Sequence, residues 1–203
     1  MGLRESKKVA TRAALSWAAI RLTVERGYDE VKVEDIAAAA GVSPRTFNNY
    51  FSSKAEAIAA RQLDRFLEVS AELRRRPPGE SLWTAITAAA MAQFQPGPEV
   101  LAHPVPDQLQ WTVGLRLMMA EPVLQGELLR AGAVAEAELA AAIAERTGTD
   151  VKHDFYPNLV AATVTAINAA TVAFYLRADP PVRMDTLLPE AFTRAAAGLP
   201  PPT

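Results

Sequence analysis

The sequence predicts an all-α protein. Half of its 203 residues are hydrophobic, with alanine dominant among them, and cysteine is absent. Alanine-rich segments with few β-branched runs favour helices over sheets. In addition, no window shows the strict apolar–polar alternation of a half-buried strand. Proline and glycine clusters then divide the chain into segments of helical length.

The first four expected helices are delimited by local breaks. The first ends at Gly27, and the next two lie on either side of a tight break at Gly41. The fourth is long and ends at Pro77-Pro78-Gly79. Glycine and proline at these places stop a helix because glycine accepts positive φ and proline lacks an N–H. The ranges expected are 7–26, 33–40, 44–50 and 54–76.

Five further helices are expected in the rest of the chain. Three prolines between 97 and 106 indicate a loop, and Pro122 restarts a helix that stops at Gly148. Asp179-Pro180-Pro181 ends the next helix, and a proline-rich tail follows the last. The ranges expected are 81–95, 108–120, 122–147, 154–177 and 185–199, which brings the total to about nine helices.

Charge is distributed unevenly between the two parts of the chain. Residues 1–76 carry 14 Lys and Arg against 10 Asp and Glu, whereas residues 77–203 carry 7 against 13. The basic N-terminal part and the acidic C-terminal part suggest that only the N-terminal part contacts phosphates, although the net charge of the chain is −2. We therefore expect a nucleic-acid-binding domain over 1–53 and a second domain over 54–203.

Several classes of function are not supported by the composition. Without cysteine there is no disulfide or thiolate metal site, and His103 and His153 lie far apart. No metal and no cofactor are therefore expected. No glycine-rich phosphate loop or catalytic cluster is visible, so an enzyme is not expected. The charged N-terminus lacks the apolar run of a signal peptide, and no membrane span is expected, which predicts a cytoplasmic protein.

Residues 33–51 have the pattern of a helix-turn-helix. Gly41 can take positive φ and close the first helix, and Val42 turns inward behind it. Ser43 is a good N-cap, and Pro44 suits the first position of the second helix. Small and apolar residues at the helical spacing supply the inward faces of both helices. This arrangement predicts a two-helix DNA-reading element.

The outward face of the second helix carries side chains suited to DNA bases. Arg45 can bind guanine and Asn49 can bind adenine in the major groove. Flanking groups are placed to contact phosphates, since Tyr50 has a hydroxyl and Lys54 lies at a helix N-terminus. Near the chain start, Arg4, Lys7 and Lys8 are expected to form a mobile basic arm. The predicted DNA-binding residues are Lys32, Ser43, Arg45, Thr46, Asn48, Asn49, Tyr50 and Lys54.

The stretch from Thr11 to Ala60 resembles the N-terminal domain of TetR-family transcriptional regulators. The similarity is carried by residues 25–28, 33–37, 40–43, 46–51 and Lys54. It implies that Tyr50 and Lys54 hold phosphates, and that Arg45, Thr46 and Asn49 meet bases. One departure is Thr23, where the family usually has Phe. We expect Leu15, Trp17 and Leu22 to compensate in the small core.

The C-terminal half is expected to make a dimer and to hold an effector. The helix around 159–176 is apolar or small almost all round, so it must be buried on most of its circumference. With the last helix it could form a four-helix interface in a homodimer, while a monomer core helix is the alternative. Residues 115–124 and 144–148 resemble the C-terminal domain of mycofactocin-type TetR regulators, which implies an acyl-CoA-like or other extended apolar effector.

An apolar ligand pocket with few polar groups is predicted in this half. Each candidate residue could instead simply fill the core. The predicted lining residues are Trp83, Phe94, Trp111, Leu115, Met118, Met119, Phe155 and Tyr175.

The sequence as a whole predicts a dimeric repressor that binds a palindromic operator and is released by a small apolar effector. The partners expected are double-stranded operator DNA, a second copy of the chain and the effector. One alternative remains open. A helical protein of this kind could bind small molecules after losing operator binding, although the presence of both Tyr50 and Lys54 argues against it.

Overall fold

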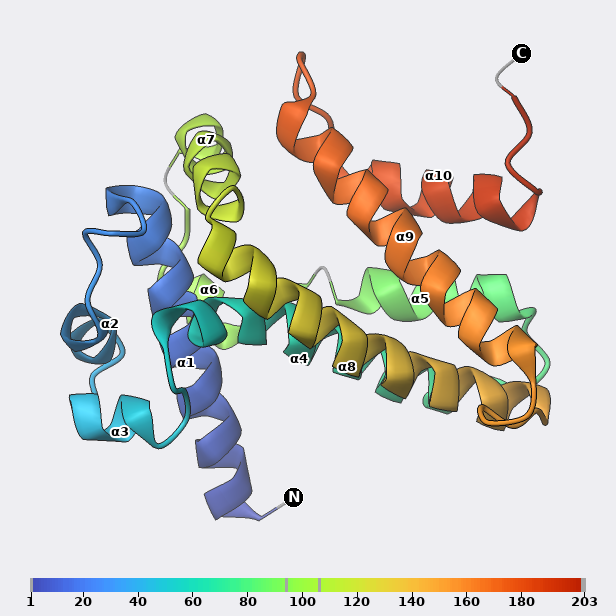
Figure 1. Ribbon diagram of the computed structural model, residues 1–203, viewed down its shortest axis with the longest axis horizontal. Coiled ribbons are helices and arrows are strands. Elements are labelled where there is room, and N and C mark those ends of the chain that lie inside the picture. The colour runs from blue at the N-terminus through green and yellow to red at the C-terminus, as the bar shows by residue number, and fades with distance from the viewer. Residues whose placement is uncertain (1, 94, 106, 202–203) are drawn as a thin grey trace. The chain divides into compact units, whose positions relative to one another are not determined.

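A computed structural model describes residues 2–93, 95–105 and 107–201, where it contains ten helices and no strand (Figure 1). The all-α prediction is therefore confirmed. The helices are α1 Leu3–Arg26, α2 Val33–Ala39, α3 Pro44–Asn48, α4 Lys54–Arg75, α5 Leu82–Ala92, α6 Pro98–Ala102, α7 Gln108–Met119, α8 Pro122–Thr147, α9 Phe155–Arg177 and α10 Met184–Ala196.

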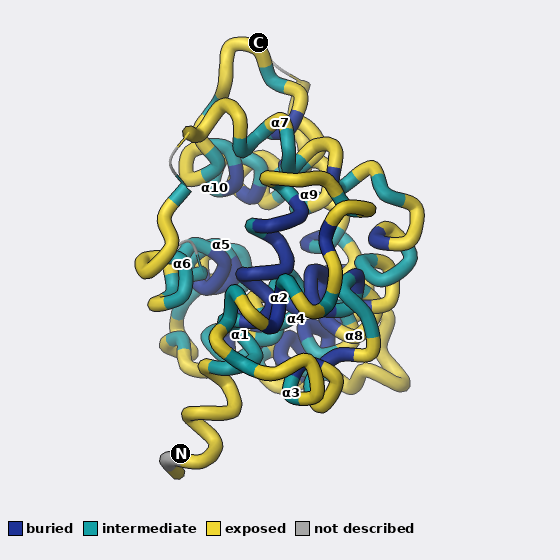
Figure 2. Tube along the Cα trace, turned by 90° about the vertical axis from the view of Figure 1, so that its left-hand side faces the viewer, coloured by how far each residue is buried: buried dark blue, intermediate teal, exposed yellow. Residues whose placement is uncertain are grey.

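Two local predictions were wrong. The segment expected to be a loop contains α6, which begins with Gly97 as N-cap and Pro98 in its first turn. Proline is tolerated there because the first N–H groups of a helix have no intrahelical partner. The basic residues near the chain start form no extended arm, since Arg4, Lys7 and Lys8 belong to the first turns of α1 and are exposed (Figure 2).

The chain divides into two compact units. Unit 1 comprises residues 1–63 and 96–131, and unit 2 comprises residues 64–95 and 132–203. The division falls within α4 and α8, and it assigns α6 and α7 to the unit that holds α1, α2 and α3. These compact units differ from the functional division expected at residue 53, which stays a prediction.

Unit 1 is built around the inward faces of α1, α2 and α3. Ile36, Phe47 and Phe51 are almost fully buried there. Leu15, Trp17 and Leu22 of α1 are buried in the same core, as are Thr23 and the helical residues Ala57, Ile58 and Met118. The core therefore accepts Thr23 where the TetR resemblance led us to expect Phe, with large apolar neighbours on the same helix.

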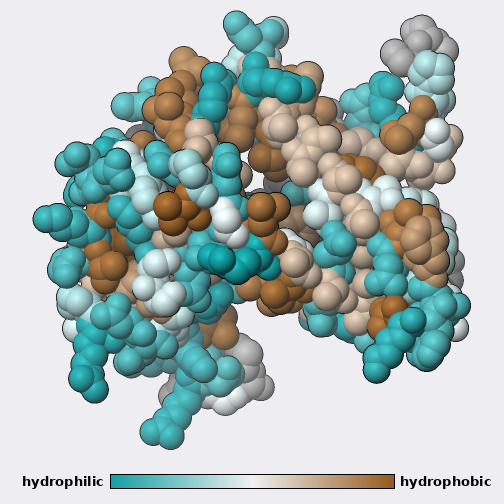
Figure 3. Space-filling view, in the orientation of Figure 1, coloured by the Kyte–Doolittle hydropathy of each residue, from teal (hydrophilic) through white to brown (hydrophobic). Residues whose placement is uncertain are grey.

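The α7 helix approaches α1 closely within unit 1. A Cβ atom built on Gly114 would lie 2.5 Å from the carbonyl oxygen of Val24 and 2.7 Å from its Cγ1. Real Cβ atoms do not approach other heavy atoms so closely, so only glycine fits at this crossing. On its other side α7 exposes Leu109, Val113 and Leu117. Brown residues gather over this helix in Figure 3.

Unit 2 has its own core, made by α5 and α10 together with parts of α4, α8 and α9. Leu73, Ile86, Ile143, Val164 and Phe192 are almost fully buried in it. The Trp83 ring lies against Phe192 with a centroid separation of 6.5 Å. Each unit thus buries a separate apolar cluster.

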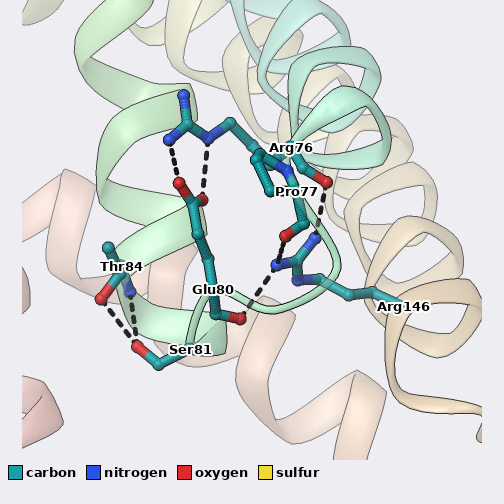
Figure 4. A network of polar contacts seen from close by, with 6 residues as sticks. All are labelled: Arg76, Pro77, Glu80, Ser81, Thr84 and Arg146. Carbon is teal, nitrogen blue, oxygen red and sulfur yellow. Dashed lines mark hydrogen bonds and ion pairs between the residues drawn. The ribbon is translucent and has the colours of Figure 1, made fainter.

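Arg146 of α8 holds the turn between α4 and α5 in unit 2 (Figure 4). Its guanidinium donates hydrogen bonds to the carbonyl oxygens of Arg76 (3.2 Å), Pro77 (2.6 Å) and Glu80 (3.0 Å). Arg76 in turn pairs with the Glu80 carboxylate. The Arg146 side chain therefore links the end of α4 to the turn before α5, and the Arg76 carbonyl is one that a helix end leaves without an intrahelical partner.

The α9 helix keeps one apolar face exposed. Pro157, Val160, Ala161 and Val164 are buried, whereas Phe155 is 76% exposed. Tan and brown residues cover much of α9 in Figure 3. By length and composition α9 is also the one helix among the described residues that could cross a membrane, with 22% of its most apolar window buried. A core helix of a soluble protein can have the same length and apolar composition.

Candidate nucleic-acid interface

The local sequence determines how α2 begins and ends. Lys32 precedes the helix, and its backbone N–H donates to the Asp35 carboxylate at 2.9 Å. At the other end Gly41 adopts φ +68°. The N–H of Gly41 then reaches the carbonyl of Ala38, and the N–H of Val42 reaches that of Ala37 at 2.9 Å. This left-handed closure turns the chain sharply into α3.

The α3 helix starts with the expected cap. Ser43 Oγ accepts a hydrogen bond from the Thr46 N–H at 3.1 Å, and Pro44 occupies the first helical position. The hydroxyls of Ser43 and Thr46 also lie 2.9 Å apart. Both hydroxyls therefore orient the start of α3 in this structure. The helix ends at Asn48, two residues before the predicted end.

The predicted base-reading residues share one side of α3. Phe47 is fully buried and faces the core, whereas Arg45, Asn48 and Asn49 are exposed. Thr46 is partly buried beside its cap. The arrangement presents a guanidinium and two carboxamides outward from a helix that the Phe47–Phe51 ring contact anchors at 5.7 Å. Such side chains can form paired hydrogen bonds with base edges.

The Lys54 side chain, predicted to contact a DNA phosphate, is held by hydrogen bonds within the protein. Its ammonium donates to the carbonyl oxygen of Val31 at 2.8 Å and also to that of Tyr28. It lies 4.0 Å from the centre of the Tyr28 ring. An ammonium has three N–H groups, so these two hydrogen bonds leave one for another acceptor. Burial, assisted by nearby carboxylates, raises the pKa of Tyr28, which keeps its hydroxyl protonated.

A serine hydroxyl caps the N-terminus of α4, and a carboxylate of its first turn binds the segment before the helix, an arrangement that the sequence analysis missed. Ser53 Oγ accepts the Glu56 N–H at 3.0 Å, and the Glu56 carboxylate accepts both the N–H and the hydroxyl of Ser52 at 2.7 Å. The hydrogen bond from the Ser52 hydroxyl holds the pKa of Glu56 below its usual value. The serine-to-glutamate spacing of 53 and 56 is the capping-box signal that could have revealed it.

The remaining predicted phosphate contacts lie near these groups in the chain. Lys32 is exposed just before α2, and Tyr50 is partly buried after α3 with its ring 6.4 Å from that of Phe51. Arg12 of α1 stacks over the same Phe51 ring at 4.9 Å. Unit 1 therefore gathers the predicted DNA-binding residues on and around the α2–α3 element.

The predicted pocket residues are divided between the two units. Trp111, Leu115, Met118 and Met119 all belong to α7 and pack on the unit 1 core. Trp83, Phe155 and Tyr175 belong to unit 2, and Phe155 is exposed. Phe94 lies outside the described residues. The grouping of these residues into one pocket stays a prediction.

Comparisons with known proteins agree with this architecture. A family model described as "Bacterial regulatory proteins, tetR family" matches residues 17–60, and one described as "MftR C-terminal domain" matches residues 80–200. The transcriptional regulator TcmR of Streptomyces glaucescens is 34% identical, over 94% of this chain and 88% of that protein.

Solved structures share the fold at lower identity. The fatty acid degradation regulator FadR from Bacillus halodurans has a TM-score of 0.59 and 15% identity, over 93% of this chain and 96% of that chain. A TetR-family repressor, FadR of Thermus thermophilus in complex with lauroyl-CoA, has a TM-score of 0.50 and 20% identity. The match covers 95% of this chain and 96% of that chain.

A helix-turn-helix with a buried aromatic anchor and an outward Arg and Asn face defines a DNA-binding regulator of transcription. The two family models and the curated relative make the assignment more specific, since together they cover both halves of the chain. The chain belongs to the TetR family of bacterial transcriptional regulators, whose members are not enzymes. This confirms the resemblance and the function class that the sequence analysis predicted.

Proposed function

We propose that this TetR-family protein is a homodimeric repressor that binds a two-fold symmetric operator and is released by a small apolar effector. The observation that carries this proposal is the exposed Arg45, Asn48 and Asn49 face of α3 beside a capped turn. One short helix reads few bases, so a second copy is needed to read a full site. We also propose a cytoplasmic location, since the DNA partner lies there.

The base contacts are tested by replacing one exposed side chain. Arg45→Ala should weaken binding of the protein to its own upstream DNA at least about tenfold, because a bidentate contact contributes about 1–3 kcal/mol of discrimination. Fluorescence anisotropy at fixed salt measures this. Arg75→Ala is a matched control, since exposed Arg75 pairs with Glu72 near the end of α4, outside α3 and the proposed dimer helices. Equal affinities for the two variants would refute the assigned role of Arg45.

The same binding measurement distinguishes a repressor from the alternative, a small-molecule-binding protein that has lost operator binding. A repressor should show sequence-selective binding whose affinity falls steeply with salt, because phosphate contacts release counterions. Lys32 and Tyr50 are the proposed phosphate contacts beside Lys54, while Ser43 shapes the start of α3 through its cap. Absence of selective binding at low salt would leave the small-molecule-binding alternative.

Dimerisation through α9 and α10 is supported by the pattern of exposure along α9. Its exposed positions recur every three to four residues, so they form one continuous face. Alanine is the most frequent residue among them, and its small side chain permits close approach of two helices. The positions on this face include Phe155, Leu159, Ala162, Ala166, Ala169 and Ala173.

The effector proposal is supported by the MftR-type C-terminal match and by the apolar residues of α7. We propose an extended apolar effector with an acyl-CoA-like character. Lauroyl-CoA should raise the melting temperature of the protein and release it from its operator, and free coenzyme A should do neither. Release by both compounds, or by neither, would exclude the acyl chain as the recognised part.

A further inference from the structure

A cavity of about 180 Å³ lies within unit 1, among α1, α2 and α6. Its apolar walls are alanines of all three segments and the Trp17 ring. Its polar lining comprises Arg21 of α1 together with Glu99 and His103 at the two ends of α6. None of the seven described residues predicted for the effector pocket lines it, although the ring centroids of Trp111 and Trp17 lie 5.3 Å apart.

Two buried N–H groups of this lining have no hydrogen-bond partner among the residues that the structure describes. Trp17 is 8% exposed, yet its indole Nε1 has no acceptor. The Arg21 guanidinium reaches Glu25 through Nη1 at 3.3 Å, while its buried Nε also has no acceptor. Native proteins rarely leave buried donors unpaired, so such groups point to an acceptor supplied from outside the chain.

The one carboxylate in the lining is already neutralised. Glu99 forms an ion pair with Arg61, whose side chain is largely buried. The lining therefore holds two unpaired donors against one acceptor, Glu99 Oε1, which contacts Arg61 as an ion pair but accepts no hydrogen bond. An oxygen acceptor carried by an anion suits Arg21 best, because charge-assisted hydrogen bonds are stronger than neutral ones.

The volume of the cavity limits the size of the apolar part of the ligand. An apolar cavity of about 150 Å³ in another protein accepts a benzene molecule. A cavity of about 180 Å³ with alanine walls therefore has room for one small ring or a short branched chain besides a carboxylate.

We propose that this cavity is a second small-molecule site, distinct from the effector site, and that it takes a compact monocarboxylate. The carboxylate accepts hydrogen bonds from Trp17 Nε1 and Arg21 Nε, and the apolar body lies against the alanines. Ala39 and Ala40 immediately precede Gly41, the residue that closes α2. A bound molecule therefore contacts the helix-turn-helix at its turn.

Benzoate is the probe, and the three indole N–H signals in an NMR spectrum of the full protein are the readout. Single Trp→Phe variants at 17, 83 and 111 assign these signals. Benzoate should shift the Trp17 signal in a saturable way at millimolar concentrations and leave the Trp83 signal in place. Benzyl alcohol, which lacks the carboxylate, should bind at least tenfold more weakly.

Cavity-filling variants test the location. Ala14→Leu should weaken benzoate binding at least tenfold, whereas Ala10→Leu, one turn earlier on α1 and outside the cavity, should leave it unchanged. Arg21→Lys keeps the charge but removes Nε–H, and it should also weaken binding. If Ala14→Leu does not fold, Ala102→Leu at an exposed position replaces it.

A Trp17 signal that benzoate does not shift, or a benzoate affinity that these filling variants leave unchanged, would overturn the proposal. Operator binding and the response to lauroyl-CoA are measured separately, so their failure would not affect this outcome.

Discussion

Lys54 stabilises unit 1 through hydrogen bonds, and it is also the residue for which we propose a phosphate contact. Its ammonium fixes the segment between α1 and α2 through the carbonyl oxygens of Tyr28 and Val31. A third N–H remains for the DNA phosphate contact that we propose for Lys54. The side chain is therefore held in place before DNA arrives, which lowers the entropy lost on binding.

Replacing Lys54 should consequently change both stability and salt dependence. Lys54→Met is expected to destabilise the protein by about 1.5–3 kcal/mol, the value of hydrogen bonds to a charged group. It should also lower the salt slope of operator binding by about 1.8 for the dimer, which is about 0.9 for the contact of each subunit. Lys32→Gln should lower the slope alone, because Lys32 is exposed. Urea unfolding and anisotropy titrations measure the two effects. Lost stability with an unchanged slope would restrict Lys54 to the structural role.

Glu56 should make unit 1 sensitive to acid. Its pKa in the folded chain lies below the usual value of 4.5, chiefly because the Ser52 hydroxyl donates to the carboxylate. The stabilisation by the ionised group is therefore fully present above pH 4.5 and is lost as pH falls through the lowered pKa. Wild type should melt above Glu56→Gln at neutral pH, and the difference between the two melting temperatures should shrink as pH falls below 4.5. A difference that is constant with pH would contradict this assignment.

At the scale of the elements, the crossing of α1 and α7 depends on one missing side chain. Gly114 lets the α7 backbone approach the Val24 carbonyl, and no rotamer change can relieve a clash with a backbone atom. Because the same unit carries the DNA-reading helix, this crossing links α7 directly to the body that supports α3.

Gly114→Ala should destabilise the protein by about 1–3 kcal/mol, as overpacking does at a tight contact. Gly126→Ala is the matched control, because a Cβ there meets no atom within 4 Å. Gly126 lies inside α8, where Gly→Ala should stabilise by about 0.5–1 kcal/mol. Chemical unfolding measures both variants. Equal effects of the two substitutions would show that α7 can move away from α1 without cost.

At the scale of the whole molecule, the exposed apolar face of α9 needs a covering surface. An apolar helix that is solvated along one face favours association, and a second copy offers the same face by symmetry. The same length and composition would also suit a membrane span. A dimer covers one face of α9, whereas a membrane would surround it.

Ala166→Arg should weaken the dimer more than about 100-fold, because an unpaired charge at a buried interface costs several kcal/mol. Ala10→Arg makes the same change on an exposed position of α1 and should leave the dimer intact. Analytical ultracentrifugation without detergent measures both variants. A wild-type protein that stays monomeric at all concentrations, or that requires detergent to remain in solution, would refute the dimer.

The sequence by itself determined the features that depend on neighbouring residues. Gly41, Ser43 and Pro44 specify a turn and a cap within a few positions, so the helix-turn-helix and its outward face could be predicted. Helix-stopping prolines likewise gave most helix boundaries. Only the tertiary structure decided contacts between distant residues, among them the carbonyl partners of Lys54 and the fit of Gly114 against Val24. These contacts depend on how helices from distant parts of the chain pack against one another. The residue spacing within one helix does not reveal that packing. For the same reason α6 was missed and the cavity beside it could not be foreseen, since its lining comes together only when α1, α2 and α6 pack.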